Sequence, residues 1–196
     1  MNPQTAQTDA QILDLLKERW SPRAFADKLI ESDKVQSLFE AARWSPSCFN
    51  DQPWQFVLSQ KDDSEGYDRI LRCLLEKNQS WAKTAPLIGI AVARNSFRHN
   101  QKPNRHAWYD LGQAMAHLTF QAAAMGLYVH QMAGFSETAA RSELAIPDGF
   151  DPVSAFTIGY LGSPEALPEN QRQGETSPRS RLKAAEFVHQ GVWQSK

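Results

Sequence analysis

Three short polar segments carry the residue types that could bind a charged or hydrogen-bonding ligand. The first is Arg19-Trp20-Ser21-Pro22-Arg23, which follows a predicted helix. Its two guanidinium groups and one hydroxyl could hold a phosphate or a carboxylate, because arginine presents forked donors that match such oxygens. The alternative is a solvated helix end in which Arg19 interacts with the helix dipole. On this segment alone we favour the alternative.

The second segment is a loop that runs from Pro46 to Trp54 and carries serine, asparagine and glutamine side chains. Prolines near both ends restrict its backbone, so its donors and acceptors would be fixed in space. Such a loop suits the edge of a heteroaromatic ring, where fixed hydrogen bonds select one orientation. The alternative is an ordinary turn, because Ser, Asn, Asp and Pro all favour turns. We expect Trp54 itself to be a core residue.

The third segment is Ser177-Pro178-Arg179-Ser180-Arg181, which again places two arginines two residues apart. It could supply further cationic donors to an anion, or it could be the charged tip of a solvated tail. The three segments are well separated in the sequence. Helices and strands must therefore bring them together if they act at one site.

The sequence lacks the patterns of several common enzyme classes. It contains no GxGxxG, GxxxxGK[ST], GxSxG or HExxH pattern and no EF-hand loop. Its five histidines have no close metal-ligand spacing, and Cys48 and Cys73 are its only cysteines. We therefore expect no metal, no disulfide scaffold and no Rossmann, P-loop, hydrolase or zincin chemistry. The cysteine usage favours a reducing, cytoplasmic location.

The composition is that of a folded globular protein. The chain has 196 residues, 41% of them hydrophobic and 22% charged, with a formal net charge of −1. This balance gives no general attraction to nucleic acid or to an acidic membrane, and the N-terminus shows no signal-peptide pattern. From Leu111 to Ser136 there is no Asp, Glu, Lys or Arg. Because this run contains histidines and glutamines, we expect a helix buried in the core or a subunit interface rather than a membrane span.

Apolar periodicity predicts helices that alternate with a few apolar strands. Helices are expected over residues 9–18 (with Thr8 as N-cap), 33–44, 67–75, 106–126 and 136–145, and strands over 54–58, 87–93, 127–132 and 153–161. Residues 162–181 are expected to form a loop. This order favours an α+β or α/β class with one central sheet. No linker divides the chain, so we expect residues 1–196 to form a single domain.

Taken in order, the motifs resemble those of the FMN-dependent nitroreductase family, of the oxygen-insensitive NAD(P)H nitroreductase or flavin reductase type. The resemblance rests on Arg-x-Ser-x-Arg-x-Phe from Arg19 to Phe25, on Pro-Ser-x-x-Asn-x-Gln-Pro-Trp from Pro46 to Trp54, and on the late Arg-x-Arg pair. Each motif is weak alone, but their order across nearly the whole chain is specific.

This resemblance implies a nitroreductase-like three-layer α+β sandwich with a central, mainly antiparallel sheet flanked by helices. It also implies a homodimer with exchanged tails and FMN at the subunit interface. Residues 1–8 would be a flexible N-terminus, and residues 176–196 would form a C-terminal tail that wraps the partner subunit. A buried helix from the dimer axis would account for the uncharged run after Leu111.

The resemblance further implies which residues bind FMN, and these come from four parts of the chain. The phosphate and ribityl chain would be held by Arg19, Ser21 and Arg23 with Trp20 beside them, and by Arg179 and Arg181. The ring would be lined by Pro46, Ser47, Cys48 and Asn50 of the other subunit, by Asn78 at the pyrimidine edge, and by Gln131, Met132, Ala133 and Gly134. Some members have Glu at the position of Ala133 and Lys at that of Trp81, so the pocket here differs.

The family's chemistry implies an NAD(P)H-dependent FMN oxidoreductase that works by ping-pong hydride transfer at flavin N5. The small-molecule acceptor would be a nitroaromatic, a quinone or a flavin, and we expect no side-chain acid or base in the chemical step. One alternative is a different reaction on the same scaffold, of the dehydrogenase, dehalogenase or flavin-consuming type. Another is an FMN-binding or redox-sensing protein without turnover. A purely structural role would require the arginine clusters to be accidental.

Overall fold

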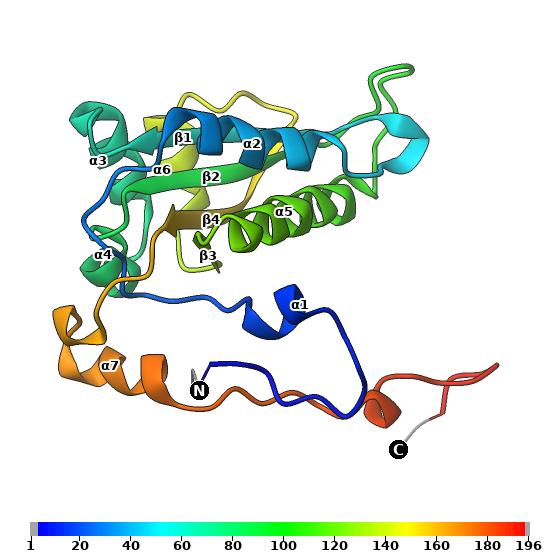
Figure 1. Cartoon of the computed structure of the whole chain (residues 1–196). Coiled ribbons are helices and arrows are strands. Elements are labelled where there is room, and N and C mark those ends of the chain that lie inside the picture. Colours follow the sequence, from blue (N-terminus) through cyan, green and yellow to red (C-terminus); the bar gives the residue numbers. More distant parts are fainter. Residues whose placement is uncertain (1–3, 195–196) are drawn as a thin grey trace.

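The computed structural model describes residues 4–194 and shows three layers (Figure 1). The middle layer is a sheet of four strands, β1 (Trp54–Gln60), β2 (Leu87–Arg94), β3 (Tyr128–Met132) and β4 (Phe150–Gly159). The strand order is β1-β2-β4-β3, and every neighbouring pair is antiparallel. The predicted α+β class with a mainly antiparallel central sheet is confirmed.

Helices cover both faces of this sheet. One face carries α2 (Ser32–Arg43) and the long helix α5 (Ala107–Ala124), which contact each other. The other carries α3 (Ser64–Cys73), α4 (Glu76–Ala82) and α6 (Glu137–Glu143). Each face has its own hydrophobic cluster, so the sheet separates two cores.

Strand β2 is the centre of both cores. Every residue from Leu87 to Ala93 is buried. Leu87 and Ala91 belong to the cluster under α2 and α5, whereas Ile88 and Ile90 belong to the opposite cluster. Alternate side chains of a strand point to opposite faces, so a strand that is apolar at nearly every position must be covered on both sides. The prediction of such a strand here is confirmed.

The first part of the long uncharged run, from Leu111, lies in α5, and this helix ends before Gly126 as predicted. Gly126 has a φ of +72°, a conformation that glycine adopts without strain. Within one chain α5 buries only one face, which includes Leu111 and Leu118. Its outer face leaves Trp108 at 53% and Tyr109 at 68% exposed. The helix is therefore half-covered by its own chain.

The first helix is shorter than predicted. α1 spans Asp14–Glu18 instead of residues 9–18, and its N-cap residue is Leu13 instead of Thr8. None of its residues is buried, and Leu13 is 71% exposed. Because most helix stability in proteins comes from packing of an apolar face, residues 9–13 have no covered surface on which to extend the helix.

Two helices that periodicity did not predict lie beside the polar segments. α4 follows α3 after Leu74, whose extended backbone pairs with Phe135. The region 162–181 was wrongly predicted to be a loop, since it contains a 3₁₀ turn at Pro164–Ala166 and the helix α7 (Glu169–Thr176). The only buried residue of α7 is Glu175. A helix without an apolar stripe is invisible to hydrophobic periodicity.

The two ends of the chain lie side by side, below the sheet in the view of Figure 1. Of the segment 1–8 expected to be flexible, residues 1–3 lie outside the described residues. Gln4 is buried, and its side-chain amide donates hydrogen bonds to the backbone oxygens of Glu175 (2.8 Å) and Ser177 (2.7 Å). The N-terminal segment is thus joined to the end of α7.

Candidate functional site

Three guanidinium groups from the two ends of the chain gather after α1. Arg179 donates hydrogen bonds to the backbone oxygens of Lys17 (2.5 Å) and Arg19 (2.6 Å). The pKa of Arg19 is lowered by burial and, further, by the positive charges of Arg179 and Arg181. The first and third polar segments of the sequence therefore meet at one place, which we call the arginine cluster (Arg19, Arg179 and Arg181).

The charge of the arginine cluster is not balanced from within the described chain. Among residues 4–194, no carboxylate forms an ion pair with Arg19, Arg179 or Arg181. Within the same range, the guanidinium of Arg19 donates to the hydroxyl of Ser21 (3.3 Å), and that of Arg181 donates to the backbone oxygen of Ser180 (2.7 Å). Three repelling cations without a counter-ion form a site to which an anion with several oxygens would bind.

Arg23, the last residue of the first segment, is held differently. Its backbone N–H donates to the carboxylate of Glu175 in α7, and its guanidinium lies 6.0 Å from the ring centre of Trp81 in α4. The residues around it are therefore fixed by α4 and α7, the two helices that periodicity did not predict. Trp20, beside Arg19, is buried edge-on against Tyr128.

Asn78 links α4 to the turn that follows β3. Its amide nitrogen donates to the backbone oxygen of Gly134 (3.0 Å), and its amide oxygen accepts a hydrogen bond from the indole nitrogen of Trp81 (3.3 Å). A Cβ atom on Gly134 would lie 2.4 Å from that amide nitrogen, so a larger residue there would have to displace the Asn78 side chain. The predicted pair of Asn78 and Gly134 is thus brought together.

His130 of β3 is a neutral, packed residue. Its ring lies 4.5 Å from that of Trp81, and its Nδ1 is 2.9 Å from the backbone oxygen of Pro22. Because a carbonyl oxygen only accepts, Nδ1 carries the hydrogen. Burial and, to a smaller extent, the positive charge of the nearby Arg23 lower the pKa of His130 to about 4. His130 therefore ties β3 to the first polar segment without carrying a charge near neutral pH.

The remaining residues after β3 present different groups. Met132 is 4% exposed and its side chain belongs to the core, so only its backbone is available to a ligand. Gln131 and Ala133 are exposed, and the amide of Gln131 reaches Thr119 at 3.4 Å. The methyl group of Ala133 leaves the surface beside this turn open.

The loop from Pro46 to Pro53 is rigidly built. Its carboxylate Asp51 is buried, forms an ion pair with Arg94 (2.9 Å) and accepts the backbone N–H of Arg98 (2.7 Å). The backbone N–H of Cys48 donates to Asp110 at the start of α5 (3.0 Å). Phe49, Asn50 and Gln52 all have positive φ angles near 50°. Such conformations are costly for these residues and persist where surrounding bonds impose them.

The hydroxyl of Ser47 forms another bond within this loop, because it accepts the backbone N–H of Gln52 (3.0 Å). Both cysteines are free, and Cys48 is half-buried. Trp54, at the start of β1, is buried as predicted.

One chain does not bring all predicted site residues together. In Figure 1 the loop after α2 lies at the opposite end of the molecule from α4 and α7, which hold the first polar segment. Among the described residues, the hydrogen bonds of the arginine cluster do not involve Pro46, Ser47, Cys48 or Asn50.

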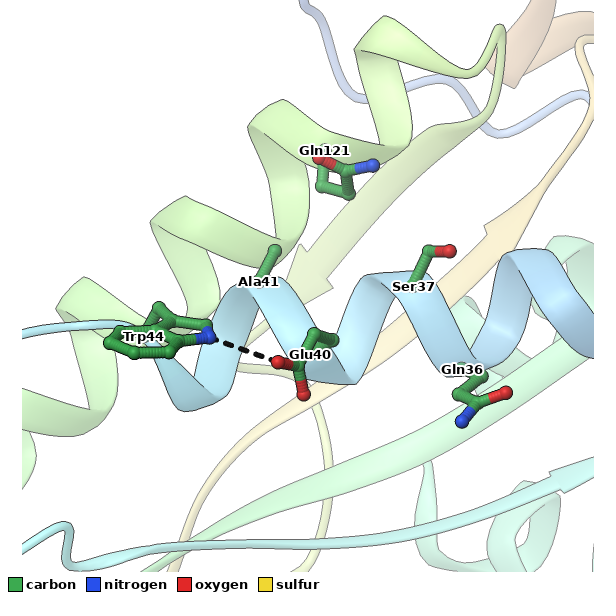
Figure 2. A pocket seen from close by; sticks show the side chains of 6 residues that line it. All are labelled: Gln36, Ser37, Glu40, Ala41, Trp44 and Gln121. Carbon is green, nitrogen blue, oxygen red and sulfur yellow. Dashed lines mark hydrogen bonds between the residues drawn. The ribbon is translucent and has the colours of Figure 1, made fainter.

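A shallow hollow of about 390 Å³ lies on the outer side of α2 and α5 (Figure 2). Its lining residues are Gln36, Ser37, Glu40, Ala41, Trp44 and Gln121. The indole of Trp44 donates to Glu40 (2.9 Å) and remains 71% exposed. None of the predicted FMN-binding residues lines this hollow, so it is separate from the arginine cluster.

The model of the family described as "Nitroreductase family" matches residues 16–84 and 65–160 of this chain. The chain belongs to the Nitroreductase family. A crystal structure described as "the oxidoreductase containing FMN" is 32% identical, covers 100% of both chains and superposes with a TM-score of 0.93. Family membership and the nitroreductase fold are thus both shown, as the motifs predicted.

More distant members of the Nitroreductase family agree with this assignment. A nitroreductase family protein from Clostridium difficile 630 shares the fold with a TM-score of 0.72 at 21% identity, over 94% of this chain and 100% of that one. A protein of Streptomyces griseus named "Putative NADH dehydrogenase/NAD(P)H nitroreductase" is 24% identical over 177 residues, which are 81% of this chain and 89% of that protein. Both proteins are thus similar to this chain over most of its length.

The residues present fit a flavin mononucleotide. The Nε of Arg179 and the indole nitrogen of Trp20 are buried donors that find no hydrogen-bond partner among residues 4–194, and buried polar groups normally have one. The uncompensated arginine cluster calls for a phosphate-like anion. The donor set of this Nitroreductase family chain therefore suits the phosphate end of the cofactor.

Other kinds of site are not found among the described residues. Within residues 4–194, no group of three or more His, Cys, Asp or Glu side chains could hold a metal ion. In the same range no helix is long and apolar enough to cross a membrane.

Glu175, Trp81, Asp51 and Asp110 shape the site but were not predicted as functional residues. Each is buried, and each acts on a partner far away in the sequence. A single polar residue inside a polar helix, as with Glu175, leaves no periodic signal. Only the Ser, Asn, Asp and Pro residues of the 46–53 loop pointed to turns there.

Proposed function

We propose that this protein is an NAD(P)H-dependent FMN oxidoreductase that reduces a nitroaromatic, a quinone or a flavin. The observation that carries the proposal is the arginine cluster, where three guanidinium groups meet without a carboxylate. In a family whose relative contains FMN, the natural counter-ion is the cofactor phosphate. When bound, FMN supplies the redox chemistry, taking a hydride from NAD(P)H and passing electrons to the acceptor in a separate half-reaction.

The chain's own residues would bind and orient the cofactor. Arg19, Ser21, Arg179 and Arg181 would surround the phosphate, while Arg23 would be oriented by α4 and α7. Asn78 would fix the turn at Gly134, whose backbone, with that of Met132 and Ala133, would line the ring. His130, the histidine beside Arg23, stays neutral because burial lowers its pKa to about 4. We therefore assign no catalytic side chain.

We also propose that two chains complete each site as a homodimer. The loop after α2, which carries Ser47, Cys48 and Asn50, lies at the opposite end of the molecule from α4 and α7 (Figure 1). A partner chain would therefore supply this loop to the flavin ring. The C-terminal segment leaves five large apolar side chains 57–80% exposed, namely Leu182, Phe187, Val188, Val192 and Trp193. An exposed apolar series of this kind marks an interaction surface. Light scattering should give the mass of two chains, and a monomer would contradict this part of the proposal.

The function is tested by an absorbance spectrum of the purified protein, followed by anaerobic addition of NADPH or NADH. We expect an oxidised-flavin spectrum that bleaches promptly and returns when a quinone or a nitroaromatic is added. A protein that binds added FMN but is not reduced by either nucleotide would be a flavin-binding protein without this activity. A colourless protein that takes up no FMN would contradict the proposal entirely.

A further inference from the structure

Helix α7 contains one buried carboxylate, and it contacts the backbone at the end of the first polar segment. The side chain of Glu175 is 1% exposed. Its two oxygens accept the backbone N–H of Arg23 at 3.0 and 3.1 Å, and one of them also accepts the N–H of Ala24 at 3.3 Å. These bonds join residues more than 150 positions apart in the sequence, so they fix the segment to α7 from a distance.

The side chain of Arg23 is held from the same side. Its Nη1 lies 3.9 Å from a Glu175 oxygen, and its guanidinium lies over Trp81 at 6.0 Å from the ring centre. A Cβ atom on Gly174 would lie 3.4 Å from Nη1, so the residue before Glu175 leaves just enough room for the guanidinium. Backbone and side chain of Arg23 are therefore both positioned by α7, and α4 completes the support.

We infer that Glu175 is a positioning residue that shapes the Arg19–Arg23 segment for the phosphate of the cofactor. This inference rests on the proposed function, because it names what the positioned segment binds. Glu175 does not contact the ligand itself, since its side chain is covered. Its burial is a cost that raises the pKa of its carboxyl group, and the three backbone N–H contacts and the charge of Arg23 oppose that rise.

The direction in which a substitution of Glu175 changes FMN affinity distinguishes a positioning role from a purely electrostatic one. Replacing Glu175 with Gln removes a negative charge close to Arg23, and by Coulomb's law alone this would make phosphate binding tighter. Glutamine has one acceptor oxygen where glutamate has two, and its NH₂ group would face the backbone N–H donors. If Glu175 positions the segment, the loss of these bonds must make FMN binding weaker.

The test compares the full-length wild type with Glu175→Gln and with the control Glu169→Gln, at the exposed start of the same helix. Dissociation constants are measured for FMN and for riboflavin, which lacks the phosphate. For Glu175→Gln we expect FMN binding weakened by about tenfold or more and riboflavin binding nearly unchanged, with a lower melting temperature of the cofactor-free protein because buried hydrogen bonds are lost. Glu169→Gln should match the wild type.

Each other result overturns the inference. Tighter FMN binding would show that Glu175 acts only through its charge, and equal weakening of both flavins with a lower melting temperature would show general structural support. A wild type that binds no FMN would instead overturn the proposed function, and the inference with it. If Glu175→Gln does not fold, hydrogen exchange of the Arg23 and Ala24 amides in the wild type decides. Protection of these two amides before FMN is added supports the inference that Glu175 positions the segment in advance. Protection that appears only after FMN is added contradicts it.

Discussion

The guanidinium of Arg179 donates a hydrogen bond of 2.6 Å to the backbone oxygen of Arg19, 160 residues earlier in the chain. A second bond of 2.5 Å reaches the backbone oxygen of Lys17. Two of the donors of Arg179 are thus used to hold the other side of the cluster in place, and its Nε remains without a partner. Arg181, in contrast, bonds only to the neighbouring backbone. The two arginines of the third segment therefore have different tasks.

Substitution of these two arginines should separate the tasks. Arg181→Met removes only a cation near the phosphate, so FMN binding should weaken by about tenfold while the melting temperature stays unchanged. Arg179→Met also releases the backbone at Lys17 and Arg19, so both FMN affinity and melting temperature should fall. Fluorescence titration and thermal melting measure the two quantities, with the exposed Arg105→Met as control. Identical behaviour of the two variants would contradict the division.

The buried ion pair of Asp51 with Arg94 should be among the largest single contributions to stability in the 46–53 loop. Their side chains are 2% and 11% exposed. Asp51→Asn leaves the Arg94 guanidinium buried without its counter-charge, which should lower the free energy of unfolding by about 3–5 kcal/mol. The control is Asp151→Asn, because Asp151 pairs with Arg141 at the same distance of 2.9 Å but is 31% exposed. This control should cost about 1 kcal/mol or less.

Chemical denaturation of both variants measures these values. Equal losses for Asp51→Asn and Asp151→Asn would show that burial does not decide the cost. Addition of Arg94→Met to Asp51→Asn should recover part of the loss, because the uncompensated charge is then gone.

The close contact of Gly134 and Asn78 predicts a non-additive pair of substitutions. A methyl group on Gly134 would lie 2.4 Å from the amide nitrogen of Asn78. Gly134→Ala must therefore turn that side chain away and break its bond to the Gly134 oxygen, at a cost of about 1–3 kcal/mol. Asn78→Ser removes the obstacle, so adding Gly134→Ala to it should cost much less. A double-mutant cycle of unfolding free energies measures the coupling, and full additivity would contradict the described contact.

His130 should make the protein less stable as the pH falls below neutrality. Its pKa drops from an ordinary 6.5 to about 4 in the folded protein, mainly through burial. Between these pH values the unfolded chain binds a proton that the folded chain does not, so the free energy of unfolding falls as the pH falls. Each pKa unit corresponds to about 1.4 kcal/mol, so the loss should approach ~3 kcal/mol.

The variant His130→Gln isolates this effect, because glutamine can still donate to the Pro22 oxygen but does not titrate. Its unfolding free energy should vary less between pH 6.5 and about 4 than that of the wild type. The carboxylates titrate in both proteins, so the difference between the two curves reports on His130. Parallel curves would show that the ring is not buried in its neutral form.

The sheet and the large helices were predictable because burial imposes a period on the sequence. β2 is apolar at nearly every position since both of its faces are covered, and apolar residues recur along α5 since one of its faces lies in the core. The order of the motifs also predicted that Arg19 and Arg181 serve one site, and the structure brings them close enough to lower the pKa of Arg19. Local sequence patterns were therefore sufficient to predict these features.

The remaining features depend on single contacts between distant residues. Glu175 connects α7 to the first polar segment, yet its partners Arg23 and Ala24 are over 150 positions away in the sequence. The positive φ angles of Phe49 and Gln52 follow from bonds such as that of Asp51 to Arg94, 43 residues later. No local pattern encodes such a pairing, so α7, the short α1 and the loop conformation could not be read from the sequence.

The meeting of the two chain ends has a consequence for synthesis. A chain leaves the ribosome from its N-terminus at about 5–20 residues per second, so the segment with Arg19 and Arg23 emerges first and its anchors, Glu175 and Arg179, emerge last. All four strands and the helices α2 to α6 lie between them and can assemble beforehand. Under the proposed function, FMN binding therefore has to follow the synthesis of α7 and of the arginines after it, and a nascent chain that stops before α7 would carry all four strands but lack Arg179 and Arg181.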